Sequence, residues 1–171
     1  MIELLKIIAP AFIVMLLALF FFDRLTNQKN LKSSSQHEVE KGKILLPLKI
    51  KAYERLIVML ERIRPHGLVM RTNNGQQTSG QLQLHLLKAV REEFEHNISL
   101  QMYVSDRVWQ TVVMAKEETL QLIKVAASKS QPNGSAMQLS QEIFSLEEQV
   151  GSSAIELALK ALKLEIRSEF Q

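Results

Sequence analysis

The chain has 171 residues, 46% of them hydrophobic, with a formal net charge of +3 and no cysteine. Cysteine clusters are therefore excluded, and the six scattered glycines form no phosphate-binding cradle. The absence of cysteine is compatible with a reducing compartment.

The chain begins with an apolar run, Ile7 to Phe22, in which sixteen residues pass without a charge. Leu4 and Leu5 extend the run to about nineteen residues, interrupted only by Lys6, which would form roughly 28 Å of helix, close to the thickness of a bilayer's hydrocarbon core. We therefore predict an N-terminal transmembrane helix over residues 1–23. The alternative is a cleaved secretory signal, although the run ends in Phe20-Phe21-Phe22-Asp23-Arg24 and offers no small-residue cleavage site.

Basic residues are concentrated after this run. Eleven Lys or Arg residues and five acidic residues lie between positions 23 and 71, whereas three bases and six acids lie between 136 and 171. Because basic residues next to a span stay on the cytoplasmic side, we predict a single-pass protein whose C-terminal domain is cytoplasmic. The basic zone could also contact anionic lipid, although fixing the topology is a sufficient reason for its charge. No motif or aromatic interleaving points to nucleic acid.

Residues 24–46 are predicted to form a basic juxtamembrane linker, because Ser, Asn, Lys and mixed charges dominate there. A helical domain, 47–171, is predicted to follow. Its first helix begins near Pro47, since proline suits the first turn, and Pro65-His66-Gly67 is predicted to end it. Leu68-Val69-Met70 is too short to assign and is compatible with an extended segment.

Three- and four-residue spacing of apolar residues predicts further helices near residues 82–94, 105–123, 139–150 and 155–166, with Ser105 as an N-cap. The core is expected in 47–128 and the C-terminal helices in 136–170. There is no internal repeat and no convincing strand pattern. We therefore predict an all-α fold: an N-terminal transmembrane helix, a linker, and a small bundle of about five helices.

A set of short segments runs from Leu46 toward the C-terminus: Leu46-Pro47-Leu48, Ala52-Tyr53-Glu54-Arg55-Leu56, Leu60-Glu61-Arg62-Ile63, Glu93-Phe94-Glu95-His96-Asn97, Tyr103-Val104-Ser105, Trp109, Ala115-Lys116-Glu117-Glu118 and Ala126-Ala127-Ser128. As a set they resemble an uncharacterised bacterial family of short proteins with one N-terminal span and a helical body. The resemblance implies a protein of the bacterial inner membrane, and it implies no activity.

Three polar residues fall on apolar helix faces. Glu93 and Asn97 project toward the apolar side of the second helix, and Lys116 lies on the apolar side of the third. Because an unpaired buried charge is costly, we predict a buried or half-buried pair of Glu93 with Lys116, with Asn97 beside it. The alternatives are that Lys116 extends outward along its alkyl stem and that Asn97 caps its own helix.

No catalytic, cofactor-binding or metal-ligating residue is predicted. Glu93 and His96 match half of the di-iron pattern of helical bundles, but the second Glu-x-x-His copy is missing. The alternative function is therefore an unrecognised membrane-bound enzyme with a polar site near Glu93, Asn97 and Lys116. No cofactor is expected.

The last predicted helix is apolar on two sides, which indicates more than one neighbour. We predict that it forms an association seam for a protein partner or a second copy of the chain, made of Ile155, Leu157, Leu159, Leu162, Leu164 and Ile166. The sequence thus favours a membrane-anchored, cytoplasmic helical interaction or scaffold protein over an enzyme.

Overall fold

The computed structural model describes residues 15, 17, 19–22, 44–149, 153–168 and 170. They fall into two units, Met1–Pro47 and Leu48–Gln171. In the first unit the described residues are helical, and those before residue 23 expose large apolar side chains: Met15, Leu17, Leu19, Phe20, Phe21 and Phe22.

No helix in the described ranges is both long enough and apolar enough to cross a membrane. A crossing helix needs about 20 consecutive, predominantly apolar residues, whereas the helices between 65 and 168 have a charged face. This finding contradicts the predicted membrane, single-pass and bacterial inner-membrane assignments, including the transmembrane helix. Of the predicted anchor, 1–23, only residues 15, 17 and 19–22 are described, and of the predicted linker, 24–46, only residues 44–46.

The second unit is built from helices, and its described residues contain no strand. Thr78 and Ser135 form an isolated antiparallel bridge between two loops. The predicted all-α class is confirmed.

The first helical stretch of this unit, residues 48–62, is followed at once by α2 (Pro65–Thr72). Pro65 occupies the first position of α2, where its missing N–H leaves no hydrogen bond unmade. The proline predicted to end one helix therefore also begins the next. Leu68 and Val69 are buried in α2, so the segment left unassigned from the sequence is helical.

The next two α-helices begin with side-chain caps. Before α3 (Ser79–Glu95), Thr78 Oγ1 accepts from Gln81 N at 3.2 Å while Gln81 Oε1 accepts from Thr78 N at 3.0 Å. A 3₁₀-helix, η1 (Ile98–Tyr103), follows. Ser105 caps α4 (Asp106–Ser128) by accepting from Val108 N at 3.3 Å, which confirms the predicted cap. These caps fix where the long antiparallel helices start.

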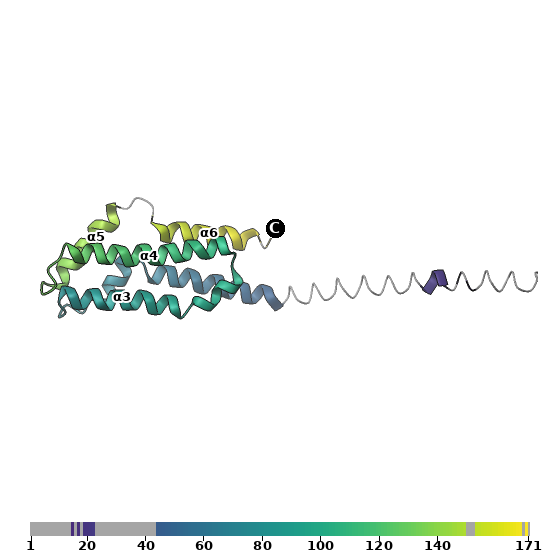
Figure 1. The fold of residues 1–171 in the computed structure, drawn as a ribbon, viewed down its shortest axis with the longest axis horizontal. Helices are drawn as coiled ribbons and strands as arrows, with labels where there is room; N and C mark the ends of the chain where they lie inside the picture. The colour runs from purple at the N-terminus through teal and green to yellow at the C-terminus, as the bar shows by residue number, and fades with distance from the viewer. Residues whose placement is uncertain are drawn as a thin grey trace, which may run out of the picture. The chain divides into compact units, whose positions relative to one another are not determined.

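The long helix α4 packs against helices on more than one side. It contacts α3, α5 (Ala136–Gln149) and α6 (Ala154–Ser168), and α5 also contacts α2 and α3. Figure 1 shows α6 beside α4, with α5 at the other end of α4. Two consecutive helices, α5 and α6, thus cover successive lengths of α4.

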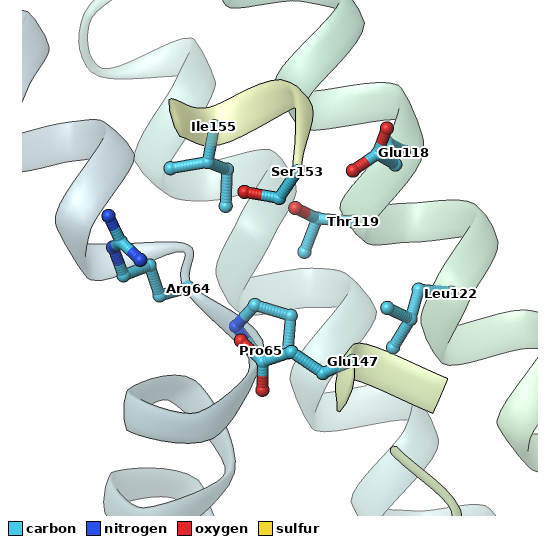
Figure 2. Close-up of a pocket in the computed structure, with 8 residues that line it drawn as sticks. All are labelled: Arg64, Pro65, Glu118, Thr119, Leu122, Glu147, Ser153 and Ile155. Carbon is cyan, nitrogen blue, oxygen red and sulfur yellow. The ribbon is translucent and has the colours of Figure 1, made fainter. Parts of the chain in front are cut away.

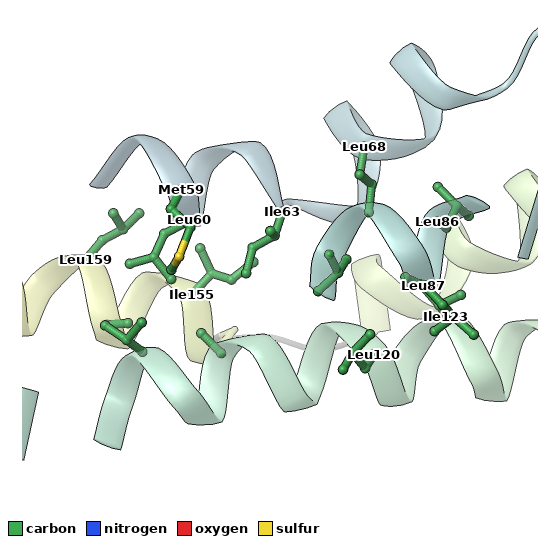
Figure 3. Packing of buried hydrophobic residues seen from close by; sticks show 14 of the residues in the cluster. Met59, Leu60, Ile63, Leu68, Leu86, Leu87, Leu120, Ile123, Ile155 and Leu159 are labelled. Carbon is green, nitrogen blue, oxygen red and sulfur yellow. The ribbon is translucent and has the colours of Figure 1, made fainter. Parts of the chain in front are cut away.

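Apolar side chains from every α-helix of the second unit form one core. In Figure 3, Met59, Leu60 and Ile63 face Ile155 and Leu159 of α6. At the other end, Leu87 of α3 lies beside Ile123 of α4. The core therefore buries one face of α6 and leaves its opposite face outside.

Candidate functional site

The predicted polar group at Glu93, Asn97 and Lys116 is divided in the structure. Glu93 Oε2 forms an ion pair with Arg62 Nε at 2.9 Å, and the Glu93 side chain is 19% exposed. Asn97 is buried, and its Nδ2 donates to the Glu93 carbonyl at 2.8 Å. Asn97 thus closes the end of its own helix, which was one of the two alternatives.

The ammonium of Lys116 lies 4.8 Å from the centre of the Phe94 ring. Its ionic partner is the neighbouring Glu117. The Phe94 ring in turn packs on Trp109, with the ring centres 5.4 Å apart. Glu93 and Lys116 therefore have different ionic partners. Their contacts do not bring the two side chains together into a shared polar site.

The six residues of the predicted association seam separate into two sets. Ile155, Leu159 and Leu162 are buried, and Ile166 is partly buried against the core. Leu157 and Leu164 are 56% and 58% exposed. The first set is ordinary core, whereas the second set lies on the outer surface of α6.

A groove of about 560 Å³ runs between α4 and α6 beside these two leucines. Its α4 wall is formed by Arg107, Val108 and Thr111. Its α6 wall consists of Leu157, Lys160, Ala161, Leu164, Glu165 and Ser168. We call this surface the α4/α6 groove. Its wall is mainly apolar, with charged side chains at its edges.

Another groove, of about 420 Å³, lies on the other side of α6 against the chain around Glu61 and Arg64. Lys160 and Leu164 line both grooves, so the outer surface of α6 is continuous from one to the other. Arg64 forms ion pairs with Glu61 at 2.6 Å and with Glu156 at 3.9 Å. Lys163 and Arg167 add two further basic side chains.

Glu165 connects the C-terminal half of α6 to Tyr53 and Ser105. Its carboxylate accepts hydrogen bonds from the Tyr53 hydroxyl at 2.6 Å, from Ser105 N at 2.9 Å, and from the Ser105 hydroxyl. Burial raises the pKa of Glu165, but the hydrogen bonds from Ser105 and Tyr53, with the charge of Lys49, outweigh it and leave the pKa below its usual value. The sequence analysis missed this residue because its partners are distant in sequence.

A small cavity of about 20 Å³ lies where α5 ends and α6 begins, and Figure 2 shows its lining. Thr119 and Ser153 contribute hydroxyl groups, and Glu118 accepts from Ala154 N at 2.9 Å at the start of α6. This volume is enough for about one water molecule, so the cavity is too small for a substrate. Within the described ranges, no three His, Cys, Asp or Glu side chains are grouped to hold a metal ion.

One family model matches residues 1–169, and its description is "Family of unknown function (DUF7935)". Neither a curated protein nor a solved structure matches the chain.

Proposed function

Because the chain belongs to this family of unknown function, we propose a role from its own geometry: it is a helical interaction protein that docks a protein partner on the α4/α6 groove. The observation that carries this proposal is the exposure of Leu157 and Leu164, at 56% and 58%, beside a groove of about 560 Å³. Exposed apolar groups that gather at a groove mark binding surfaces more often than single exposed leucines do.

The spacing of the two leucines supports a helical or extended protein segment as the occupant. They are separated by seven residues, which is about two helical turns or roughly 10 Å along α6. Apolar residues at this interval recur on one face of a helix and are matched by the same interval on a partner helix.

The core already accounts for the other face of α6. Ile155, Leu159 and Leu162 are buried there, and Glu165 fixes the helix through Tyr53 and Ser105. The two exposed leucines are therefore not needed to attach α6 to the domain. This division supports a role for them outside the chain.

The enzyme alternative has less support. Glu93, Asn97 and Lys116 are occupied by contacts within the chain, as described above. The grooves on either side of α6 and the cavity at its start are lined by other residues. None of these grooves or cavities brings the three residues together around a space that a substrate could enter.

The proposal is tested with the full-length chain carrying a photoreactive amino acid in place of Leu157, expressed in its native cells. Leu84 of α3, which is 68% exposed, is the matched control position. We expect a discrete protein adduct at position 157 that is absent at position 84 and is lost when Leu164→Glu is added. Equal crosslinking at both positions, or adducts that do not depend on Leu164, would contradict the proposal.

A further inference from the structure

Four basic side chains surround the exposed leucines: Arg107 on α4, and Lys160, Lys163 and Arg167 on α6. All four are exposed. None of them takes part in the ion pairs that the structure shows among its described residues. Their charges are thus available to a partner.

The acidic side chains of the same surface are engaged within the chain. Glu61 and Glu156 are both partners of Arg64. Glu165 accepts hydrogen bonds from Tyr53 and Ser105. The two grooves are lined by five basic side chains and three acidic ones, so a molecule that approaches the surface meets an excess of positive charge around an apolar centre.

The basic residues lie on both sides of the apolar centre. At about 100° per residue, Lys160 and Arg167 lie together on one side of Leu157 and Leu164, whereas Ala161 and Ser168 lie on the side toward α4. Arg107 stands on the α4 wall of the groove. The groove is therefore bordered by cations on its two edges.

A second copy of the chain fits this charge pattern poorly. A two-fold dimer through this surface would use the same patch on both subunits and would place one net positive patch against another. Like charges brought together at an interface cost free energy and slow association. Charge complementarity favours a partner whose surface is acidic.

We propose that the partner is an amphipathic helix with carboxylates flanking its apolar stripe, seated in the α4/α6 groove. This inference rests on the proposed docking function and names the chemistry of its partner. Apolar residues of the helix contact Leu157, Ala161 and Leu164. Its Glu or Asp side chains pair with Arg107 on one edge and with Lys160 and Arg167 on the other.

The test measures binding of the full-length chain to a fluorescein-labelled helical peptide of about 20 residues, long enough for stable helix. The acidic probe has leucines in a three- and four-residue pattern flanked by Glu, and the control probe has Lys in place of every Glu. Fluorescence anisotropy should show the acidic probe binding about tenfold or more tightly, with an affinity that falls as salt is added. The double charge reversal Arg107→Glu with Lys160→Glu should transfer the preference to the lysine probe.

Two further variants separate the failure of this inference from the failure of the docking function. If both probes bind equally and Leu157→Glu with Leu164→Glu abolishes both, the surface docks helices without the proposed charge preference, and the inference is overturned. If the leucine variant binds as the unmodified chain does, the docking function itself is wrong.

Two alternative occupants are measured in parallel. Stronger binding to anionic phospholipid vesicles than to the acidic probe, through the same cations, would replace the helix by a lipid surface. Self-association in sedimentation equilibrium that Leu164→Glu removes would replace it by a second copy. Either result overturns the inference.

Discussion

α5 and α6 both pack on α4, but their polar attachments differ in kind. At the start of α5, backbone groups join the first residues of α3 to the loop that precedes α5: Ser79 N donates to the Gly134 carbonyl at 2.8 Å, and Gly80 N donates to the Pro132 carbonyl at 2.9 Å. Near the end of α6, the carboxylate of Glu165 accepts the hydrogen bonds from Tyr53 and Ser105. The attachment of α5 uses backbone N–H and carbonyl groups, whereas the attachment of α6 depends on a single ionisable side chain.

Close approach also distinguishes the α5 attachment. A Cβ added at Gly80 would lie 3.2 Å from the Pro132 carbonyl oxygen, a backbone atom that cannot rotate away. Glycine at position 80 therefore lets the start of α3 approach the loop before α5. We expect the α5 attachment to respond to backbone crowding and the α6 attachment to respond to the charge of Glu165.

The largest expected effects test whether the apolar attachments of the two helices are equal. Leu139 of α5 and Leu162 of α6 are both fully buried. Leu139→Ala and Leu162→Ala should each lower the free energy of unfolding by about 2–5 kcal/mol, because each leaves a cavity. Urea unfolding of the full-length variants measures this. A loss near zero at Leu162 would mean that Glu165, rather than the apolar face, holds α6.

Removal of the carboxylate should have the next largest effect. Glu165→Ala should cost about 2 kcal/mol in urea unfolding, because hydrogen bonds to a charged group are lost and three donors lose this acceptor. Glu156→Ala on the exposed side of α6 is the control, and it should change stability by about 0.5 kcal/mol or less. Equal losses in the two variants would remove the distinction between the attachments.

The α6 attachment should also depend on pH. The pKa of Glu165 is lower in the folded chain than its usual value, which is about 4.3 in an unfolded peptide. Its contribution is therefore present above that unfolded value and is lost as the pH falls through the lower folded value. The difference in unfolding free energy between the unmodified chain and Glu165→Gln should persist from neutral pH down to about pH 5 and shrink below about pH 4. A difference that stays constant to pH 3 would show that the charge of Glu165 does not stabilise α6.

The smallest expected effect concerns the ion pair of Arg62 with Glu93, near the C-terminal end of α3. The pair of Arg62 with Glu93 is half exposed, with side-chain exposures of 56% and 19%. A double-mutant cycle with alanine should give a coupling of about 0.2–1 kcal/mol for this pair. The corresponding cycle for Glu93 and Lys116 should give a coupling near zero. A larger coupling in the second cycle would favour the pair expected from the sequence.

The sequence predicted helix positions better than it predicted helix partners. Apolar spacing and the Ser105 cap were sufficient to place α3 and α4, because those signals are local. The spacing of apolar residues indicated on which helix faces Glu93 and Lys116 lie. It could not show that Arg62 lies closer to Glu93 than Lys116 does. The membrane assignment came from the hydropathy of residues 7–22, from the basic residues that follow them and from the family resemblance, and the described helices do not support it.

Only part of the candidate site could be predicted from the sequence, because local signals do not show which distant residues meet. The exposure of Leu157 and Leu164 follows from their position opposite the buried stripe of α6, but the sequence analysis placed them in one seam with residues that pack in the core. Glu165 was missed because Tyr53 and Ser105 lie 112 and 60 residues away along the chain. Its position at the edge of the apolar stripe was the one signal that could have found it.

Two helix interruptions occur at the same level of the domain. One separates residues 48–62 from α2 at Arg64 and Pro65, and the other separates α5 from α6; both border the small cavity of Figure 2. α3 is continuous over 17 residues and α4 over 23 residues, past this level. α3 and α4 are therefore continuous past a level at which the first helical stretch of the domain breaks before Pro65. Under a bending load, this unit should bend first at Arg64 and Pro65, where proline has no N–H to donate along the helix, while α3 and α4 keep their hydrogen bonds.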